Sequence, residues 1–121
     1  MPKILIADDE KIVRDIFVKF LANHGFSVFQ AQDGAEALDK INNDNFDLLI
    51  MDLKMPKVKG PDILEAMRVN NKQVPTIILT GMVDASDSGE LKKFGYTDND
   101  ILCKPVDLYE LLAAVKNKLK L

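Results

Sequence analysis

The residues of this chain that could do chemistry together are a few acids, one lysine and one threonine. Asp8 and Asp9 stand near the amino terminus, Asp52 near the middle, and Thr80 and Lys104 further on. Clustered carboxylates repel one another and each ionises less readily. A hard divalent cation such as Mg²⁺, or Mn²⁺ in its place, relieves that repulsion and prefers oxygen ligands. A metal beside one carboxylate, with a lysine and a hydroxyl close by, could support phosphoryl transfer to an aspartate.

Each of these residues follows a short apolar run that predicts a buried strand. The runs cover residues 4–7, 28–31, 48–51, 76–79 and 101–103. The run at 48–51 is continuously apolar, which is typical of a strand buried on both faces. The run at 76–79 predicts another buried strand. In open parallel sheets ligands bind beyond the carboxyl ends of the strands. We therefore expect Asp8, Asp9, Asp52, Thr80 and Lys104 to meet at one edge of the sheet.

Helical patterns alternate with these strands. Apolar residues recur at helical spacing between residues 13 and 21, before a stop at His24 and Gly25. Asp33 and Asp107 resemble N-caps of two further helices, and Pro61 suits the first turn of another. The segment 84–94 is poor in helix formers and predicts only a short, mobile helix.

This alternation predicts an α/β fold with a doubly wound, five-stranded parallel sheet covered by helices on both faces. We expect the strand order 2-1-3-4-5 of the flavodoxin-like layout, within a single domain over residues 1–121 with no effector domain after it. The length of 121 residues fits one compact domain.

Composition excludes several classes of protein. The net charge is -3, without the basic surplus of a nucleic-acid binder. No apolar stretch reaches membrane-spanning length. Cys103 is the one cysteine, so no internal disulfide forms, and we expect it to be a small buried hydrophobic residue. These features agree with a cytoplasmic protein.

Taken in order, four motifs resemble the receiver domain of two-component response regulators. They are Ile4-Leu5-Ile6-Ala7-Asp8-Asp9-Glu10, then Asp52-Leu53-Lys54-Met55-Pro56, then Thr80-Gly81, then Lys104-Pro105. Each motif alone is weakly specific, but together they span the chain at the spacing of the family. The resemblance implies a signalling switch that catalyses only its own phosphorylation and slow dephosphorylation. It does not imply an enzyme with a separate substrate.

The resemblance also implies a role for each residue. Asp52 would be the phosphoacceptor, Asp9 a direct metal ligand, and Asp8 the carboxylate that holds the waters of the metal. The backbone carbonyl of Lys54 would complete the coordination by the protein. Thr80 would bond a phosphoryl oxygen, Lys104 would pair with the phosphoryl group or with Asp52, and the Lys104–Pro105 peptide would be cis.

Two departures from the family concern how the phosphorylated state is read. Ile101 stands where many members carry an aromatic residue that moves with the threonine, and Val106 stands where phenylalanine is common.

Lys54 and Met82 occupy the positions that tune hydrolysis, and their long side chains predict slow loss of the phosphoryl group.

The expected partners are a sensor histidine kinase or a histidine phosphotransfer protein. An unidentified downstream partner would bind the face formed by residues 84–94, the strand 101–103 and the last helix. Neither nucleic acid nor membrane is expected to bind this chain.

Other interpretations stay open. The same fold could carry a metal-dependent phosphatase with an aspartyl-phosphate intermediate, although Lys54 replaces its usual second acid. Another interpretation is a pseudo-receiver that binds partners without being phosphorylated. A flavin or nucleotide site is disfavoured because the acids after the first strand would repel phosphate. More simply, Asp8 and Asp9 could cap a helix, Asp52 could be an ordinary loop acid, and Lys104 could be a surface lysine.

Overall fold

A computed structural model describes residues 1–53, 55, 57, 60–81, 95–97 and 100–121. The strands are β1 (Lys3–Ala7), β2 (Ser27–Ala31), β3 (Leu48–Asp52), β4 (Thr76–Thr80) and β5 (Ile101–Cys103). They form one parallel sheet in the order β2-β1-β3-β4-β5, which confirms the predicted strand order. β3 and β4 each run one residue further than predicted, so Asp52 and Thr80 belong to the strands themselves.

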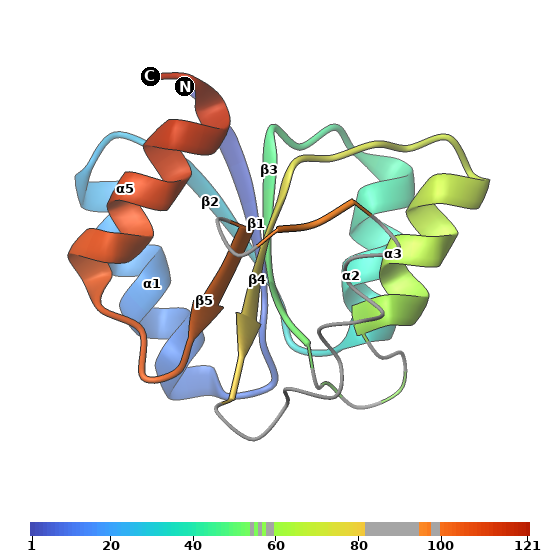
Figure 1. Ribbon diagram of the computed structural model, residues 1–121, viewed down its shortest axis with the longest axis horizontal. Helices are drawn as coiled ribbons and strands as arrows, with labels where there is room; N and C mark the ends of the chain where they lie inside the picture. Colours follow the sequence, from blue (N-terminus) through green and yellow to red (C-terminus); the bar gives the residue numbers. More distant parts are fainter. Residues whose placement is uncertain (54, 56, 58–59, 82–94, 98–99) are drawn as a thin grey trace.

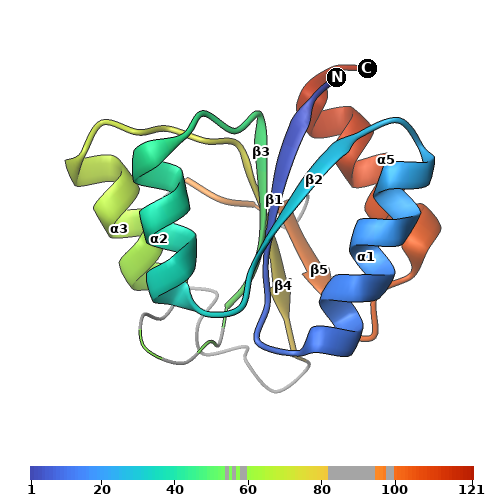
Figure 2. The same ribbon diagram turned by 180° about the vertical axis from the view of Figure 1, so that it is seen from behind.

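Helices cover both faces of this sheet. They are α1 (Lys11–Asn23), α2 (Gly34–Asn43), α3 (Gly60–Val69) and α5 (Leu108–Leu119). Figure 1 shows α1 and α5 on one face and α2 and α3 on the other, and Figure 2 shows the same layers from behind. The predicted helix at 84–94 lies outside the described residues. Among the described helices, none is long and apolar enough to cross a membrane.

The core forms two layers because successive side chains of a strand point to opposite faces. Leu5 and Leu49 belong to the cluster beneath α2 and α3, whereas Ile4 and Ile50 belong to the cluster beneath α1 and α5. All four are fully buried. The central strands are thus covered on both sides, as their continuous apolar runs predicted.

Side chains at the helix ends fix where the helices begin. The Asp33 carboxylate accepts a hydrogen bond from the Glu36 N–H at 2.8 Å, and Asp107 accepts from the N–H groups of Tyr109 and Glu110. Both predicted N-caps are therefore confirmed. At α1 the N-cap residue is Glu10, without a side-chain capping bond. The simpler interpretation of Asp8 and Asp9 as caps of that helix is wrong.

Cys103 does not behave as predicted. Its position at the end of β5 is exposed rather than buried. β5 is three residues long and lies at the end of the strand order, so no further strand among the described residues pairs with its outer side. An apolar run in a strand at the end of the sheet therefore leaves its thiol accessible.

Candidate phosphoacceptor and metal site

Three strand ends bring the predicted residues together. Asp8 follows β1, Asp52 is the last residue of β3, and Lys104 follows β5. In a parallel sheet all carboxyl ends lie at one edge, which is the lower edge in Figure 1. The two termini lie together at the opposite end of the sheet. The architecture alone therefore places these side chains next to one another.

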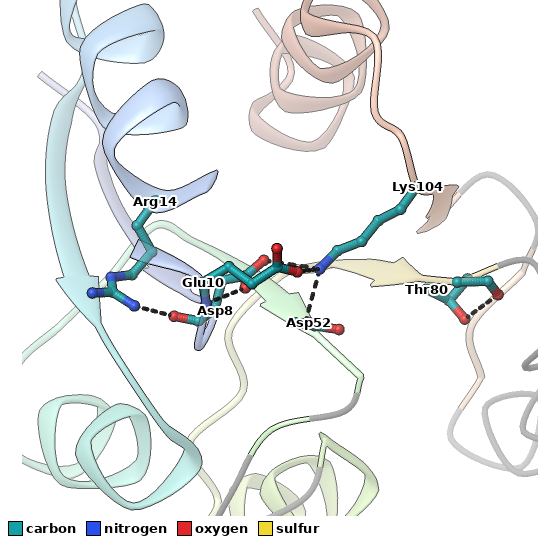
Figure 3. Close-up of polar contacts among 7 residues, drawn as sticks. Asp8, Glu10, Arg14, Asp52, Thr80 and Lys104 are labelled. Carbon is teal, nitrogen blue, oxygen red and sulfur yellow. Dashed lines mark hydrogen bonds and ion pairs between the residues drawn. The ribbon is translucent and has the colours of Figure 1, made fainter. Parts of the chain in front are cut away.

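Lys104 is the centre of the polar contacts at this edge (Figure 3). Its Nζ lies 2.9 Å from Oδ2 of Asp52, 3.2 Å from Oδ2 of Asp8 and 3.4 Å from Oε1 of Glu10. The side chain of Asp8 is fully buried and that of Asp52 is 10% exposed. Lys104 is thus no free surface lysine, and Asp52 is no loop acid.

Four carboxylates form a cluster here, and three of them contact the Lys104 ammonium group. One oxygen from each of Asp8, Asp9, Glu10 and Asp52 lies within 4.8 Å of the others. The set carries more negative charge than Lys104 balances, and it offers the hard oxygen ligands that Mg²⁺ prefers. The donor set therefore fits a divalent cation. Sequence reasoning assigned Asp8, Asp9 and Asp52 to this site but gave Glu10 no role, although it directly follows the acidic pair.

The electrostatics of the site follow from burial and from charge. Burial raises the pKa of Asp8 above its ordinary value of 3.8, and the nearby charge of Asp52 adds to that rise, while the Glu10 N–H and Lys104 oppose it. Burial disfavours the charged form of Lys104, but its hydrogen bond and charge interaction with Asp52, together with Asp8, outweigh that effect. The pKa of Lys104 is consequently held above its ordinary value. Lys104 is a permanent cation at neutral pH.

Backbone hydrogen bonds connect the end of β4, where Thr80 lies, to Lys104. The N–H of Lys104 donates to the carbonyl of Thr80 at 2.8 Å, and the N–H of Leu53 donates to the carbonyl of Leu79 at 2.9 Å. The hydroxyl of Thr80 donates to the carbonyl of Gly81 at 3.2 Å. The Lys104–Pro105 peptide is cis, as the resemblance implied. The ends of β3, β4 and β5 are therefore joined where Asp52, Thr80 and Lys104 stand.

Comparison with known proteins agrees with this geometry. A family model described as the response regulator receiver domain matches residues 4–116. The chain belongs to the response regulator receiver family.

Relatives of this receiver domain are found among curated proteins and solved structures. It is 34% identical over 118 residues to response regulator MprA of Mycobacterium sp. (strain KMS), a match that covers 98% of this chain and 50% of that protein. The chain thus spans about half the length of the curated relatives it matches. The Francisella response regulator 1452 receiver domain superposes with a TM-score of 0.89 at 34% identity, covering 99% of this chain and 98% of that one. Vibrio cholerae chemotaxis protein CheY4 gives a TM-score of 0.87 at 31% identity, covering 98% and 99%.

The remaining predicted residues of the receiver domain divide into two groups. Lys54 and Met82 lie outside the described residues. Ile101 is described and stands opposite Ile78 in the β4–β5 pairing. It is half-buried and packs against the core cluster beneath α2 and α3.

A groove opens directly beside the site. It has a volume of about 630 Å³ and runs between α1 and the segment that joins β5 to α5. Its walls include Glu10, Val13, Phe17, Lys104, Val106 and Leu108. Because Glu10 and Lys104 belong to both, a molecule held in the groove would reach the carboxylate cluster.

Proposed function

We propose that this receiver domain accepts a phosphoryl group on Asp52 and acts as a signalling switch. One observation carries the proposal, namely the 2.9 Å contact between Lys104 Nζ and Oδ2 of Asp52 inside a four-carboxylate cluster. Asp52 is oriented by the cation of Lys104, and it is the last residue of β3, at the edge of the sheet where the carboxyl ends of the strands lie. Structural ion pairs alone would not require the additional acids.

The proposed transfer starts from a phosphohistidine of a donor protein. A carboxylate oxygen of Asp52 attacks phosphorus, the N–P bond to the imidazole breaks, and the new O–P bond leaves an acyl phosphate on Asp52. Such transfers depend mainly on positioning and on charge stabilisation. Lys104 would bind the phosphoryl oxygens with its ammonium group, and Thr80 would donate its hydroxyl to one of them.

Asp8, Asp9 and Asp52 would hold a Mg²⁺ or Mn²⁺ ion, with the backbone carbonyl of Lys54 as a further ligand. Glu10 is close enough to join them. The ion, when bound, offsets the negative charge on the transferring oxygens. Around it, the chain itself orients Asp52 through its contact with Lys104, and it buries Asp8 so that this carboxylate stays in place.

The phosphohistidine donor would be a sensor histidine kinase or a histidine phosphotransfer protein. The groove between α1 and the β5–α5 segment supports this assignment because it is largely apolar and leads to Glu10 and Lys104. A donor seated there would present its imidazole to Asp52 without opening the fold.

The output would pass through the face formed by residues 84–94, β5 and α5 to a downstream partner. Ile101 cannot swing a ring inward because it is β-branched and stiff at its first torsion. We therefore propose that the signal travels through the backbone after Thr80, into the segment 84–94, rather than through the side chain at position 101. Hydrogen exchange across residues 84–94, with and without beryllofluoride, tests this route, and unchanged protection there would oppose it.

The metal dependence of phosphorylation tests the proposed function. The protein is incubated with a small phosphodonor at graded Mg²⁺ concentrations, and the gain of phosphoryl mass is followed in time. Asp9→Asn should need far more Mg²⁺, whereas Asp15→Asn, an exposed acid of α1, should behave as the wild type. Equal Mg²⁺ requirements in both variants would contradict the proposed metal site. Continuous release of phosphate, with many turnovers for each protein molecule, would favour the phosphatase alternative.

A further inference from the structure

One buried cation near the site has no place in the chemistry described so far. Arg14 lies in the first turn of α1 and is only 8% exposed. Its Nη1 donates to the backbone carbonyl of Asp8 at 2.6 Å, and its Nε donates to Oε1 of Gln30 on β2 at 3.2 Å. Figure 3 shows the guanidinium on the side of Asp8 away from Lys104. It therefore acts on the site through the backbone.

The Asp8 carbonyl needs a partner because β1 ends just before it. The N–H of Asp8 still bonds the carbonyl of Ala31 on β2 at 3.2 Å. Asp8 itself is fully buried, and a buried carbonyl without a hydrogen bond is costly. Arg14 supplies that bond with a charged donor, which makes it short and strong.

Arg14 holds the other end of the same loop as well. Its backbone N–H donates to the carbonyl of Glu10 at 3.1 Å. The loop at residues 8–10 is thus fixed to Arg14 at both ends, by the side chain at Asp8 and by the main chain at Glu10. This loop supplies three of the four carboxylates of the cluster, namely those of Asp8, Asp9 and Glu10.

We propose that Arg14 is a positioning residue for metal binding, and that Gln30 orients its guanidinium from β2. The inference rests on the proposed function, since it concerns the same Mg²⁺ site. Residues that hold metal ligands in place typically change metal affinity by about 10- to 100-fold when they are replaced. Arg14 belongs to this class although it touches neither the metal nor the phosphoryl group.

Positioning and simple electrostatics predict opposite results. The guanidinium has the same sign of charge as the metal, so removing its charge alone would tighten Mg²⁺ binding. Removing a positioning bond would weaken binding instead. Arg14→Lys keeps the charge but loses the planar fork that bonds Asp8 and Gln30 together. Arg14→Gln loses the charge and the fork.

The experiment measures the Mg²⁺ dissociation constant of the unphosphorylated protein by calorimetry. Arg14→Lys and Arg14→Gln should both bind about tenfold more weakly or worse. The control Arg68→Gln removes the same charge from an exposed arginine of α3 and should leave the constant unchanged. Wild-type affinity in Arg14→Lys, or tighter binding in Arg14→Gln, would overturn the proposal.

Gln30→Ala keeps the test valid if replacement of the buried arginine impairs folding. Gln30 is exposed, so its replacement should leave the fold intact. It should weaken Mg²⁺ binding a few-fold, and it should add nothing further in the Arg14→Lys background, because contacting residues are not additive. Unchanged affinity in Gln30→Ala would show that the bond from Arg14 to β2 does not position the loop.

A second measurement separates this inference from the proposed function. The Glu10 N–H bonds Oδ1 of Asp8 at 2.9 Å, so its hydrogen exchange reports the loop geometry without metal. Faster exchange in Arg14→Lys and Gln30→Ala, in metal-free protein, is the expected result, and unchanged exchange would count against the positioning role. If the wild type bound no Mg²⁺ at all, the proposed function would fail while the exchange result still decided the role of Arg14.

Discussion

Replacing Lys104 by methionine should destabilise the metal-free protein substantially. The substitution keeps the apolar stem of the side chain but removes the ammonium that lies 2.9 Å from Asp52 and 3.2 Å from Asp8. Both carboxylates then lose the ammonium group that each of them contacts. We expect the loss of stability to be largest at low ionic strength, where charges are least screened.

The burial of Asp8, Asp52 and Lys104 determines how much free energy of unfolding the Lys104→Met variant should lose. Breaking a fully buried ion pair costs about 3–5 kcal/mol, whereas an exposed pair contributes about 0–1 kcal/mol. Asp8 is fully buried and Asp52 nearly so, but the Lys104 side chain is 23% exposed, which screens it partly. We therefore expect the free energy of unfolding to fall by about 2 kcal/mol, between these limits. For a domain of this size that corresponds to about 8 °C in melting temperature.

Urea unfolding of the metal-free protein, with matched ionic strength, measures this change. Lys11→Met serves as the control because Lys11 is 77% exposed and pairs only with Asp15 on the same helix among the described contacts. It should cost at most about 0.5 kcal/mol. Saturating Mg²⁺ should restore much of the loss in Lys104→Met, because a bound ion supplies the missing positive charge and stabilises only the folded state.

Two results would refute this reasoning. If Lys104→Met were as stable as Lys11→Met, the carboxylates would not depend on the ammonium for their charge balance. If Mg²⁺ stabilised the wild type and failed to stabilise Lys104→Met, the lysine would be part of the metal site rather than its electrostatic neighbour.

Three further predictions follow from single contacts. Asp107→Ala should lower the free energy of unfolding by about 1 kcal/mol, as for other lost N-caps, while Asp107→Asn should be nearly neutral, both measured by urea titration. The Glu36 N–H, together with Lys57, holds the pKa of Asp33 below its ordinary value of 3.8. The stability that Asp33 contributes is therefore complete above that pH and is lost as the pH falls through its folded pKa, so Asp33→Asn should flatten the acid limb of a stability profile. Ile101→Tyr should leave the phosphorylation rate unchanged while altering binding at the β5–α5 face, which a pull-down with phosphorylated protein measures once a partner is known.

Much of the fold could be predicted because each strand signal is local. The runs ending at Ala7 and Met51 are continuously apolar, and a strand buried on both faces requires this. The order of the strands was expected as one of the two common layouts of doubly wound sheets, and no single residue specifies it. Asp52 and Lys104 could be placed in one site because the carboxyl ends of parallel strands meet.

The parts that could not be predicted depend on long-range contacts. In the sequence, Arg14 is one more polar residue of an amphipathic helix. Only the packing of α1 against β1 and β2 shows that its side chain is buried and donates to the Asp8 carbonyl. Glu10 joins the cluster through the turn that follows Asp9. Cys103 is exposed because β5 is an edge strand, and a local apolar pattern does not reveal the position of a strand in the sheet.

Mapping the phosphorylated residue tests the central claim most directly. The protein is phosphorylated in Mg²⁺ by a small phosphodonor, reduced with borohydride to convert an acyl phosphate into homoserine, digested and sequenced by mass spectrometry. We expect homoserine at position 52 alone, and none in Asp52→Asn or in protein treated without Mg²⁺. Conversion at Asp8, Asp9 or Glu10 in the wild type, or phosphorylation of Asp52→Asn at the wild-type rate, would contradict the assignment of Asp52 as the phosphoacceptor.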